Sequence, residues 1–253
     1  MKKLTKAGLW VCLMGLPMQS VLAGPYYGFN VGGNSTTVEK DITYNDTRTF
    51  LSDKYSGLRL QLLFGYNFGS SILNSHAGEE GMGSDEYGDF EEIHADKDRP
   101  LDDLFFAVEA DINYNTGDAS SSISPWYLTS SASVTEQVKY GGDIFLLAKY
   151  RPIPSATFFV GPGVTQGYFN IYSSGDTAGN LGVTGDFDAT LTGWTLKAGV
   201  EVFSTNSLNM VLTYQYTNYN SITWSGIEPL TGDSVSAKYM PVVNSITIGV
   251  NMT

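Results

Sequence analysis

Alternation of apolar and polar side chains, with a period of two residues, recurs along this chain and constrains its fold more than any other feature. In the stretch LFFAVEADINYN, residues 104–115, every second side chain is apolar, from Leu104 to Tyr114. This pattern predicts a β-strand, because successive side chains of a strand point to opposite faces. Glu109 and Asp111 share the face opposite the apolar row. Buried carboxylates are costly without partners, so the fold must offer these two acids cations or water.

The same alternation predicts eight strands in all. Five further segments alternate strongly and two glycine-rich segments alternate weakly; they cover residues 57–68, 138–151, 194–203, 208–217 and 246–252, and residues 26–33 and 157–169, respectively. Pro162 lies within the last of these and lacks a backbone N–H group, so we expect a bulge there.

The connections between these strands alternate in length. Tight turns are expected at residues 152–156 and 204–207, and long loops at residues 34–56, 116–137, 174–189 and 218–237. An even number of antiparallel strands with short turns at one end and long loops at the other predicts an all-β, eight-stranded antiparallel transmembrane β-barrel. A soluble β-sandwich also alternates, but its solvent-facing side would carry more charge.

The first 23 residues read as a secretory signal peptide. Three lysines precede a short apolar run from Ala7 to Leu16, and Val21-Leu22-Ala23 follows it, so cleavage is expected after Ala23. The remainder, residues 24–253, is expected to form the barrel in the outer membrane, without the chain's one cysteine, Cys12. Removing the three lysines leaves 11 basic against 26 acidic residues, a net charge of −15, which disfavours nucleic acid as a partner.

Charged side chains on the non-apolar faces should point into the barrel. An eight-stranded barrel is narrow enough to be filled by its own side chains, so these charges should pair across the lumen and plug it. The predicted ion-pair network consists of Arg59, Glu109, Asp111, Asp143, Lys197 and Glu201, and Lys139 and Lys149 are expected on the same inner face.

These features together resemble the small eight-stranded outer-membrane barrels typified by the OmpA transmembrane domain, OmpX and the opacity proteins. The resemblance covers residues 24–253 as a pattern and includes no single diagnostic motif. It implies insertion by the barrel-assembly machinery, contact with outer-membrane lipid and lipopolysaccharide, and roles such as adhesion through the loops. Barrels of this family usually end in an aromatic residue, whereas this chain ends in Val-Asn-Met-Thr.

An acidic insertion occupies residues 70–103, where the topology expects a tight turn. It contains 11 acidic residues and both histidines, His76 and His94. Its composition is typical of a solvated, disordered loop. Divalent-cation binding through Asp96, Asp98 and Asp102 is an alternative, although no EF-hand pattern is present, and docking of a basic periplasmic partner is another.

The outer loops are rich in Ser, Thr, Asn and Tyr, which suit weak contacts with host or environmental molecules. The candidate contact residues are Trp126, Tyr127, Tyr219 and Trp224. Because no predicted strand or outer loop contains a histidine, we expect neither an enzyme nor a cofactor.

The sequence therefore favours a plugged barrel with a structural and surface-interaction role. The alternative is a narrow channel or a hydrophobic conduit like OmpW, lined by inward Phe105, Phe145, Leu147, Phe159 and Phe203.

Overall fold

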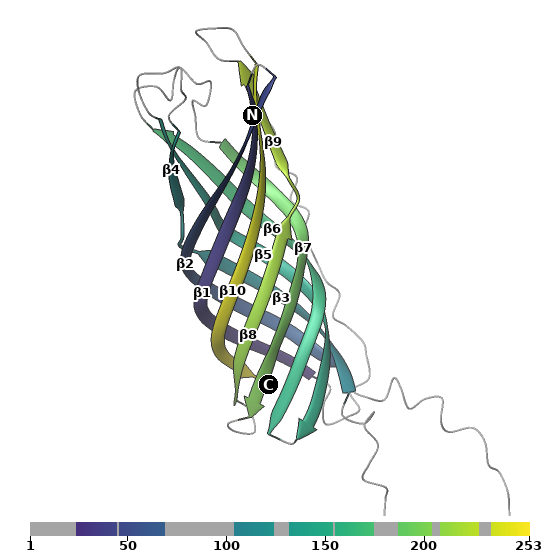
Figure 1. The fold of residues 1–253 in the computed structure, drawn as a ribbon. Helices are drawn as coiled ribbons and strands as arrows, with labels where there is room; N and C mark the ends of the chain where they lie inside the picture. Colours follow the sequence, from purple (N-terminus) through teal and green to yellow (C-terminus); the bar gives the residue numbers. More distant parts are fainter. Residues whose placement is uncertain are drawn as a thin grey trace, which may run out of the picture.

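The computed structural model describes residues 24–44, 46–68, 104–123, 132–153, 155–174, 187–203, 208–227 and 234–253. Eight long strands close into an antiparallel ring in the order β1-β2-β3-β5-β6-β7-β8-β10, with β1 paired to β10 (Figure 1). The predicted eight-stranded barrel is therefore confirmed. Among the described residues, no helix is long and apolar enough to cross a membrane.

The eight ring strands are β1 (Gly24–Tyr44), β2 (Thr47–Phe68), β3 (Leu104–Asn115), β5 (Ala132–Ile153), β6 (Ala156–Ser174), β7 (Phe187–Phe203), β8 (Leu208–Tyr219) and β10 (Ser234–Met252). Two short strands, β4 (Ala119–Ile123) and β9 (Ile222–Ile227), follow β3 and β8 after brief interruptions.

A belt of exposed apolar side chains surrounds the barrel at the end where β5 continues into β6 and β7 into β8. On β2 the belt consists of Leu58, Leu60, Leu62 and Phe64, and each neighbouring strand contributes similar outward residues. Soluble proteins rarely expose so continuous an apolar surface, whereas an outer-membrane barrel needs an apolar band about 25 Å tall. We call this part of the molecule the membrane section.

The strands continue well beyond the belt, so the expectation of a long loop at residues 34–56 is wrong. β1 and β2 stay paired in one unbroken register from Gly24↔Asn67 to Tyr44↔Thr47. Asp46, in the short connection between them, has a φ of 66°. The outward side chains here are polar, for example Glu39, Ser52 and Lys54, which are exposed.

Beyond the belt the ring separates into two sheets, which we call the extension. Pairing of β2 with β3 ends at Arg59↔Asn115, and pairing of β7 with β8 ends at Gly193↔Tyr219. The outer strand segments then pair in the orders β9-β10-β1-β2 and β4-β5-β6-β7.

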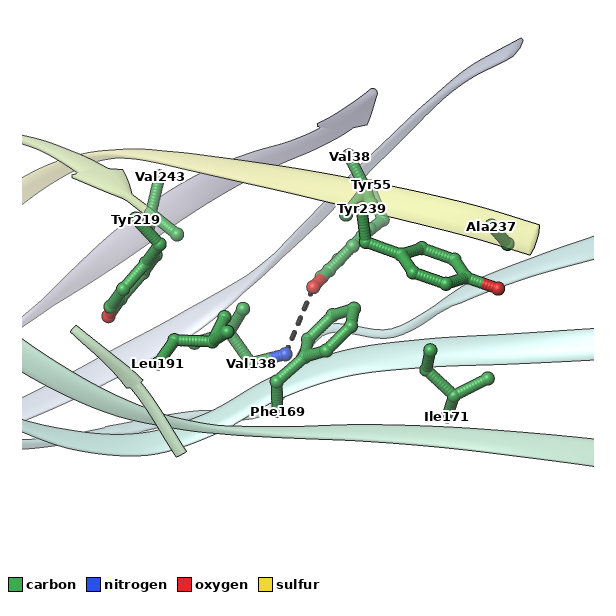
Figure 2. Close-up of a cluster of buried hydrophobic side chains, with 10 residues drawn as sticks. All are labelled: Val38, Tyr55, Val138, Phe169, Ile171, Leu191, Tyr219, Ala237, Tyr239 and Val243. Atoms are coloured by element: carbon green, nitrogen blue, oxygen red, sulfur yellow. Dashed lines mark hydrogen bonds between the residues drawn. The ribbon is translucent and has the colours of Figure 1, made fainter. Parts of the chain in front are cut away.

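An apolar core lies between the two sheets of the extension (Figure 2). This outer apolar cluster consists of Val38, Tyr55, Val138, Phe169, Ile171, Leu191, Tyr219, Ala237, Tyr239 and Val243. The extension therefore has mainly apolar side chains inside and mainly polar side chains outside, as a soluble β-protein does.

A β-bulge between Val138 and Tyr140 shifts the register of β5 against β6. Because of this shift, Val138 points inward although Tyr140, two residues later, is exposed. Lys139 is the additional residue of the bulge and is only partly buried, so its expected inward position is wrong. The bulge expected at Pro162 is also absent, because β6 keeps one register with β7 through this residue.

Candidate functional site

Buried polar side chains fill the lumen of the membrane section. Lys197 on β7 extends across the lumen and forms ion pairs with Glu109 and Asp111 of β3. The distance from Lys197 Nζ to Asp111 Oδ2 is 2.7 Å. All three side chains are almost completely buried. Alternation explains the arrangement, because odd-numbered residues of β3 and β7 face inward together.

The hydroxyl group of Tyr26 supports this ion-pair group by donating a hydrogen bond of 2.7 Å to Glu109 Oε2. Its ring lies against Gly65, its cross-strand partner, at the place where a Cβ atom would stand. Glycine at this position is therefore a steric requirement of the site.

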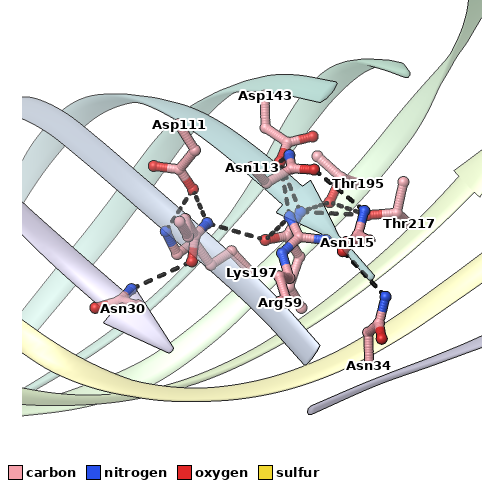
Figure 3. Close-up of polar contacts among 12 residues, drawn as sticks. Asn30, Asn34, Arg59, Asp111, Asn113, Asn115, Asp143, Thr195, Lys197 and Thr217 are labelled. Atoms are coloured by element: carbon pink, nitrogen blue, oxygen red, sulfur yellow. Dashed lines mark hydrogen bonds and ion pairs between the residues drawn. The ribbon is translucent and has the colours of Figure 1, made fainter. Parts of the chain in front are cut away.

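Arg59 and Asp143 form a second group nearer the extension (Figure 3). Arg59 Nη2 donates to Asp143 Oδ2 at 3.1 Å and to Gln215 Oε1 at 3.1 Å. Asn113 and Gln215 each donate to Asp143 Oδ2 at 3.0 Å. The carboxylate thus has a cation and two amide donors, which offsets the cost of burying its charge.

Lys149 and Glu201 form a third group toward the tight turns, with 2.8 Å between Lys149 Nζ and Glu201 Oε1. Lys149 Nζ also lies 4.3 Å from the centre of the Tyr26 ring, a cation–π contact. Apolar side chains surround this group. The inner apolar cluster consists of Tyr26, Leu63, Ala107, Phe145, Leu147, Phe159 and Val211.

The six predicted lumen residues are all buried inside the barrel. They form the three ion-pair groups described above, and Tyr26 lies between the first and the third, because it donates to Glu109 and contacts Lys149. Gln61 donates to Asp111 and to Gln215, and Gln215 donates to Asp143, so these two amides join the groups of Lys197 and Arg59. The sequence did not predict the individual partners, because these depend on the stagger of the strands. Lys149 completes the third group.

A further buried ion-pair group lies in the extension, where sequence reasoning expected loops. Lys40 of β1 pairs with Asp53 of β2 and with Glu136 of β5, 2.6 Å from Lys40 Nζ to Glu136 Oε1. Lys40 and Glu136 belong to different sheets, so their pair connects the two sheets. Burial raises the pKa of Glu136 to about 7, although the neighbouring Lys40 opposes this shift. The sequence carries a signal that these residues form strands and not a loop. The alternation continues through Val38 and Lys40, with polar outward residues between them.

The prediction that Tyr219 contacts external molecules is wrong. Tyr219 is only 4 % exposed and packs within the outer apolar cluster, so it is unable to touch an external molecule. Its odd position on β8 directs it inward, like Gln215 and Thr217. Trp224 lies in β9 opposite Ala237. Trp126 and Tyr127 lie outside the described residues.

The acidic insertion at 70–103 and the signal peptide at 1–23 also lie outside the described residues, and with them Asp96, Asp98 and Asp102. Within the described strands, no group of three or more His, Cys, Asp or Glu side chains is placed to hold a metal ion.

Comparison with known proteins defines the fold class. No protein-family model and no curated protein sequence matches this chain. Among solved structures, the outer-membrane protein OprG from Pseudomonas aeruginosa is similar over 91 % of this chain and 97 % of its own, with a TM-score of 0.55 and 13 % identity. Neisserial surface protein A matches over 88 % of this chain and 96 % of its own, with a TM-score of 0.39 and 12 % identity.

The closed ring, the apolar belt and the similarity to OprG define an outer-membrane β-barrel of eight strands. The chain is accordingly an outer-membrane protein, and its extension lies at the end opposite the short connections from β5 to β6 and from β7 to β8.

Proposed function

We propose that this protein is a closed, non-enzymatic outer-membrane barrel that contacts external proteins through its extension. The observation that carries the proposal is a pair of sheets that project beyond the apolar belt and end in strand edges that no other described strand pairs with. Edge strands present a row of N–H and C=O groups to which another extended chain can add.

The edge of β2 is the longest of these. Among the described residues, β2 has β1 as its only partner from Thr47 to Ser56. The hydrogen bonds of Leu58 show which backbone groups of β2 face the edge. Leu58 O accepts from Thr116 N at 3.0 Å, and Leu58 N donates to Thr116 Oγ1 at 3.0 Å. Backbone direction alternates along a strand, so Ser52 also directs its N–H and C=O groups to this side.

The exposed side chains along this edge fit contact with a polypeptide. Phe50 is 65 % exposed and Arg48 lies over its ring, 4.6 Å from the ring centre. Large exposed aromatic side chains beyond the membrane are typical of protein-contact surfaces.

The filled lumen supports the absence of a channel function. Four buried ion-pair groups and two apolar clusters occupy the interior. A hydrophobic conduit is the alternative, but four of the five residues proposed to line it, Phe105, Phe145, Leu147 and Phe159, are buried by other side chains. The side chain of Phe203, the fifth, lies outside the described residues.

The proposal is tested with an array of immobilised synthetic peptides and the refolded, heat-modifiable protein. We expect Ser52→Pro to lose binding to the peptides that the parent retains, because proline removes the N–H group at the free edge. Ser52→Ala is the matched control and should bind as the parent does. Equal binding by Ser52→Pro, or no peptide bound by the parent, would contradict contact through this edge.

Conductance in a planar bilayer tests the closed lumen separately. The parent should give no single-channel steps, and stable steps from heat-modifiable protein would favour the conduit.

A further inference from the structure

The barrel interior has three layers that differ in chemistry. The outer apolar cluster lies at one end and the inner apolar cluster near the other, and the groups of Lys197 and Arg59 lie between them. The apolar layers exclude water, whereas the polar layer between them can bind it.

The outer apolar cluster crosses the whole interior. Its side chains come from β1, β2, β5, β6, β7, β8 and β10, seven of the eight ring strands. Phe169 of β6 meets Tyr239 of β10, with ring centres 6.0 Å apart (Figure 2). Val138 N donates to Tyr55 Oη at 3.1 Å and joins the two sheets at the same level. A constriction of this kind excludes water and dissolved ions.

The layer between the clusters contains buried polar atoms without protein partners. Among the described residues, they include Asn30 Oδ1, Asp111 Oδ1, Asp143 Oδ1, Thr213 Oγ1 and Thr247 Oγ1. Each of these side chains is at least nine-tenths buried. Buried polar atoms that lack protein partners are normally satisfied by ordered water.

Three of these atoms lie on one wall of the lumen, on Asn30 of β1, Thr213 of β8 and Thr247 of β10. Asp111 and Asp143 lie across the lumen, on β3 and β5. Thr213 of β8 and Thr247 of β10 are direct cross-strand partners, and Gly32 of β1 is the next residue at that level. The side chains at this level of the wall are small, and the two hydroxyl groups make it polar. The flanking strands β2 and β7, which pair with β1 and β8, bear Arg59 and Lys197. These long side chains extend across the lumen to the acids of β5 and β3.

We propose that this layer is a hydrated chamber that binds ordered water along the β1, β10 and β8 wall. The outer and inner apolar clusters, and not the ion pairs, are then the barriers to solutes. The inference rests on the proposed closed barrel and identifies the residues that close it.

Cysteine accessibility tests the chamber, because Cys12 is the chain's one cysteine. In a Cys12→Ser background, Thr213→Cys is exposed to a small, charged methanethiosulfonate reagent. We compare the parent, an outer-cluster variant (Phe169→Ala with Tyr239→Ala) and a neutralised variant (Lys197→Met, Glu109→Gln, Asp111→Asn). Labelling should be slow in the parent and in the neutralised variant, and at least roughly tenfold faster in the outer-cluster variant.

Ser52→Cys is the control, because Ser52 is exposed on the extension and should label rapidly in every background. Folding of each variant is checked by heat-modifiable migration, and Phe169→Ser replaces the double substitution if that variant fails to fold. Equal labelling of the neutralised and outer-cluster variants would overturn the proposal, because the ion pairs would then be the barrier. No labelling in a folded outer-cluster variant would also overturn it. Rapid labelling of the parent would instead refute the closed barrel itself.

Discussion

The membrane section and the extension are built from the same strands but have opposite distributions of polarity. On β2, Arg59 and Gln61 point inward in the membrane section while Leu60 and Leu62 point outward. In the extension, Tyr55 points inward and Ser52 and Lys54 point outward. The inward direction continues without a change of register, so the surroundings alone select which type of side chain lies on each face. Lipid requires the first arrangement and water the second.

The largest expected effect comes from leaving buried charges without their partner. Lys197→Met would leave Glu109 and Asp111 buried with no direct cation, and should lower the free energy of unfolding by about 3–5 kcal/mol. The measurement is urea unfolding in lipid vesicles. The neutralised variant with Glu109→Gln and Asp111→Asn should recover most of that loss, and failure to recover would mean that Lys197 acts mainly through packing.

A lysine placed on the outward face should separate the two regions directly. Leu62 is 48 % exposed in the middle of the belt, and Leu62→Lys should destabilise the inserted protein by roughly 2–4 kcal/mol because a charge enters the apolar layer. Thr37→Lys, on the outward face of the extension, should change it by less than about 0.5 kcal/mol. Similar losses at both positions would show that the belt has been assigned to the wrong part of the strands.

The buried acid between the two sheets should make stability depend on pH. Burial raises the pKa of Glu136 from its ordinary value of 4.5 to about 7. The folded state therefore binds a proton more tightly than the unfolded state does. The stability present below pH 4.5 is lost as the pH rises toward 7, by at most about 3 kcal/mol.

Glu136→Gln should remove this dependence and stabilise the protein at pH 8, as measured by urea unfolding at a series of pH values. Asp53→Asn is a useful comparison, because Asp53 is partly exposed and should leave most of the slope intact. An unchanged slope in Glu136→Gln would assign the pH dependence to another group.

The smallest of these effects concerns a glycine beneath an aromatic ring. A Cβ atom at Gly199 would meet the backbone carbonyl oxygen of Leu212 and the ring of Phe159, its cross-strand partner. Gly199→Ala should therefore displace both the ring and the neighbouring backbone of β8 and cost about 1–3 kcal/mol in unfolding free energy. Gly33→Ala is the control, since nothing lies within 4 Å of a Cβ atom there, and a loss as large as that of Gly199→Ala would exclude the steric explanation.

Sequence reasoning identified the fold and the facing of the membrane section because lipid enforces a strict alternation. Glu109 and Asp111 could be assigned to the lumen from their parity on β3 alone. The alternation alone could not identify Lys197 as the partner of these two acids. The partner of a lumen residue depends on the stagger between strands that are distant in the sequence.

The same reasoning misread the extension as loops. Residues such as Val38 and Tyr55 alternate with serine, threonine and charged residues, a weaker pattern than an apolar belt. The face of Val138 was unpredictable for a different reason, since a single bulge residue, Lys139, changes which positions point inward.

The continuous hairpin of β1 and β2 also has a mechanical consequence. It passes from the lipid layer to the far end of the extension in one register, and β1 is paired with β10 over most of the same length. A pull on the outer end acts along the strands, so many ladder hydrogen bonds resist it together instead of opening one after another. We expect a contact made at the outer end to transmit tension to the membrane-embedded ring with little extension of the protein.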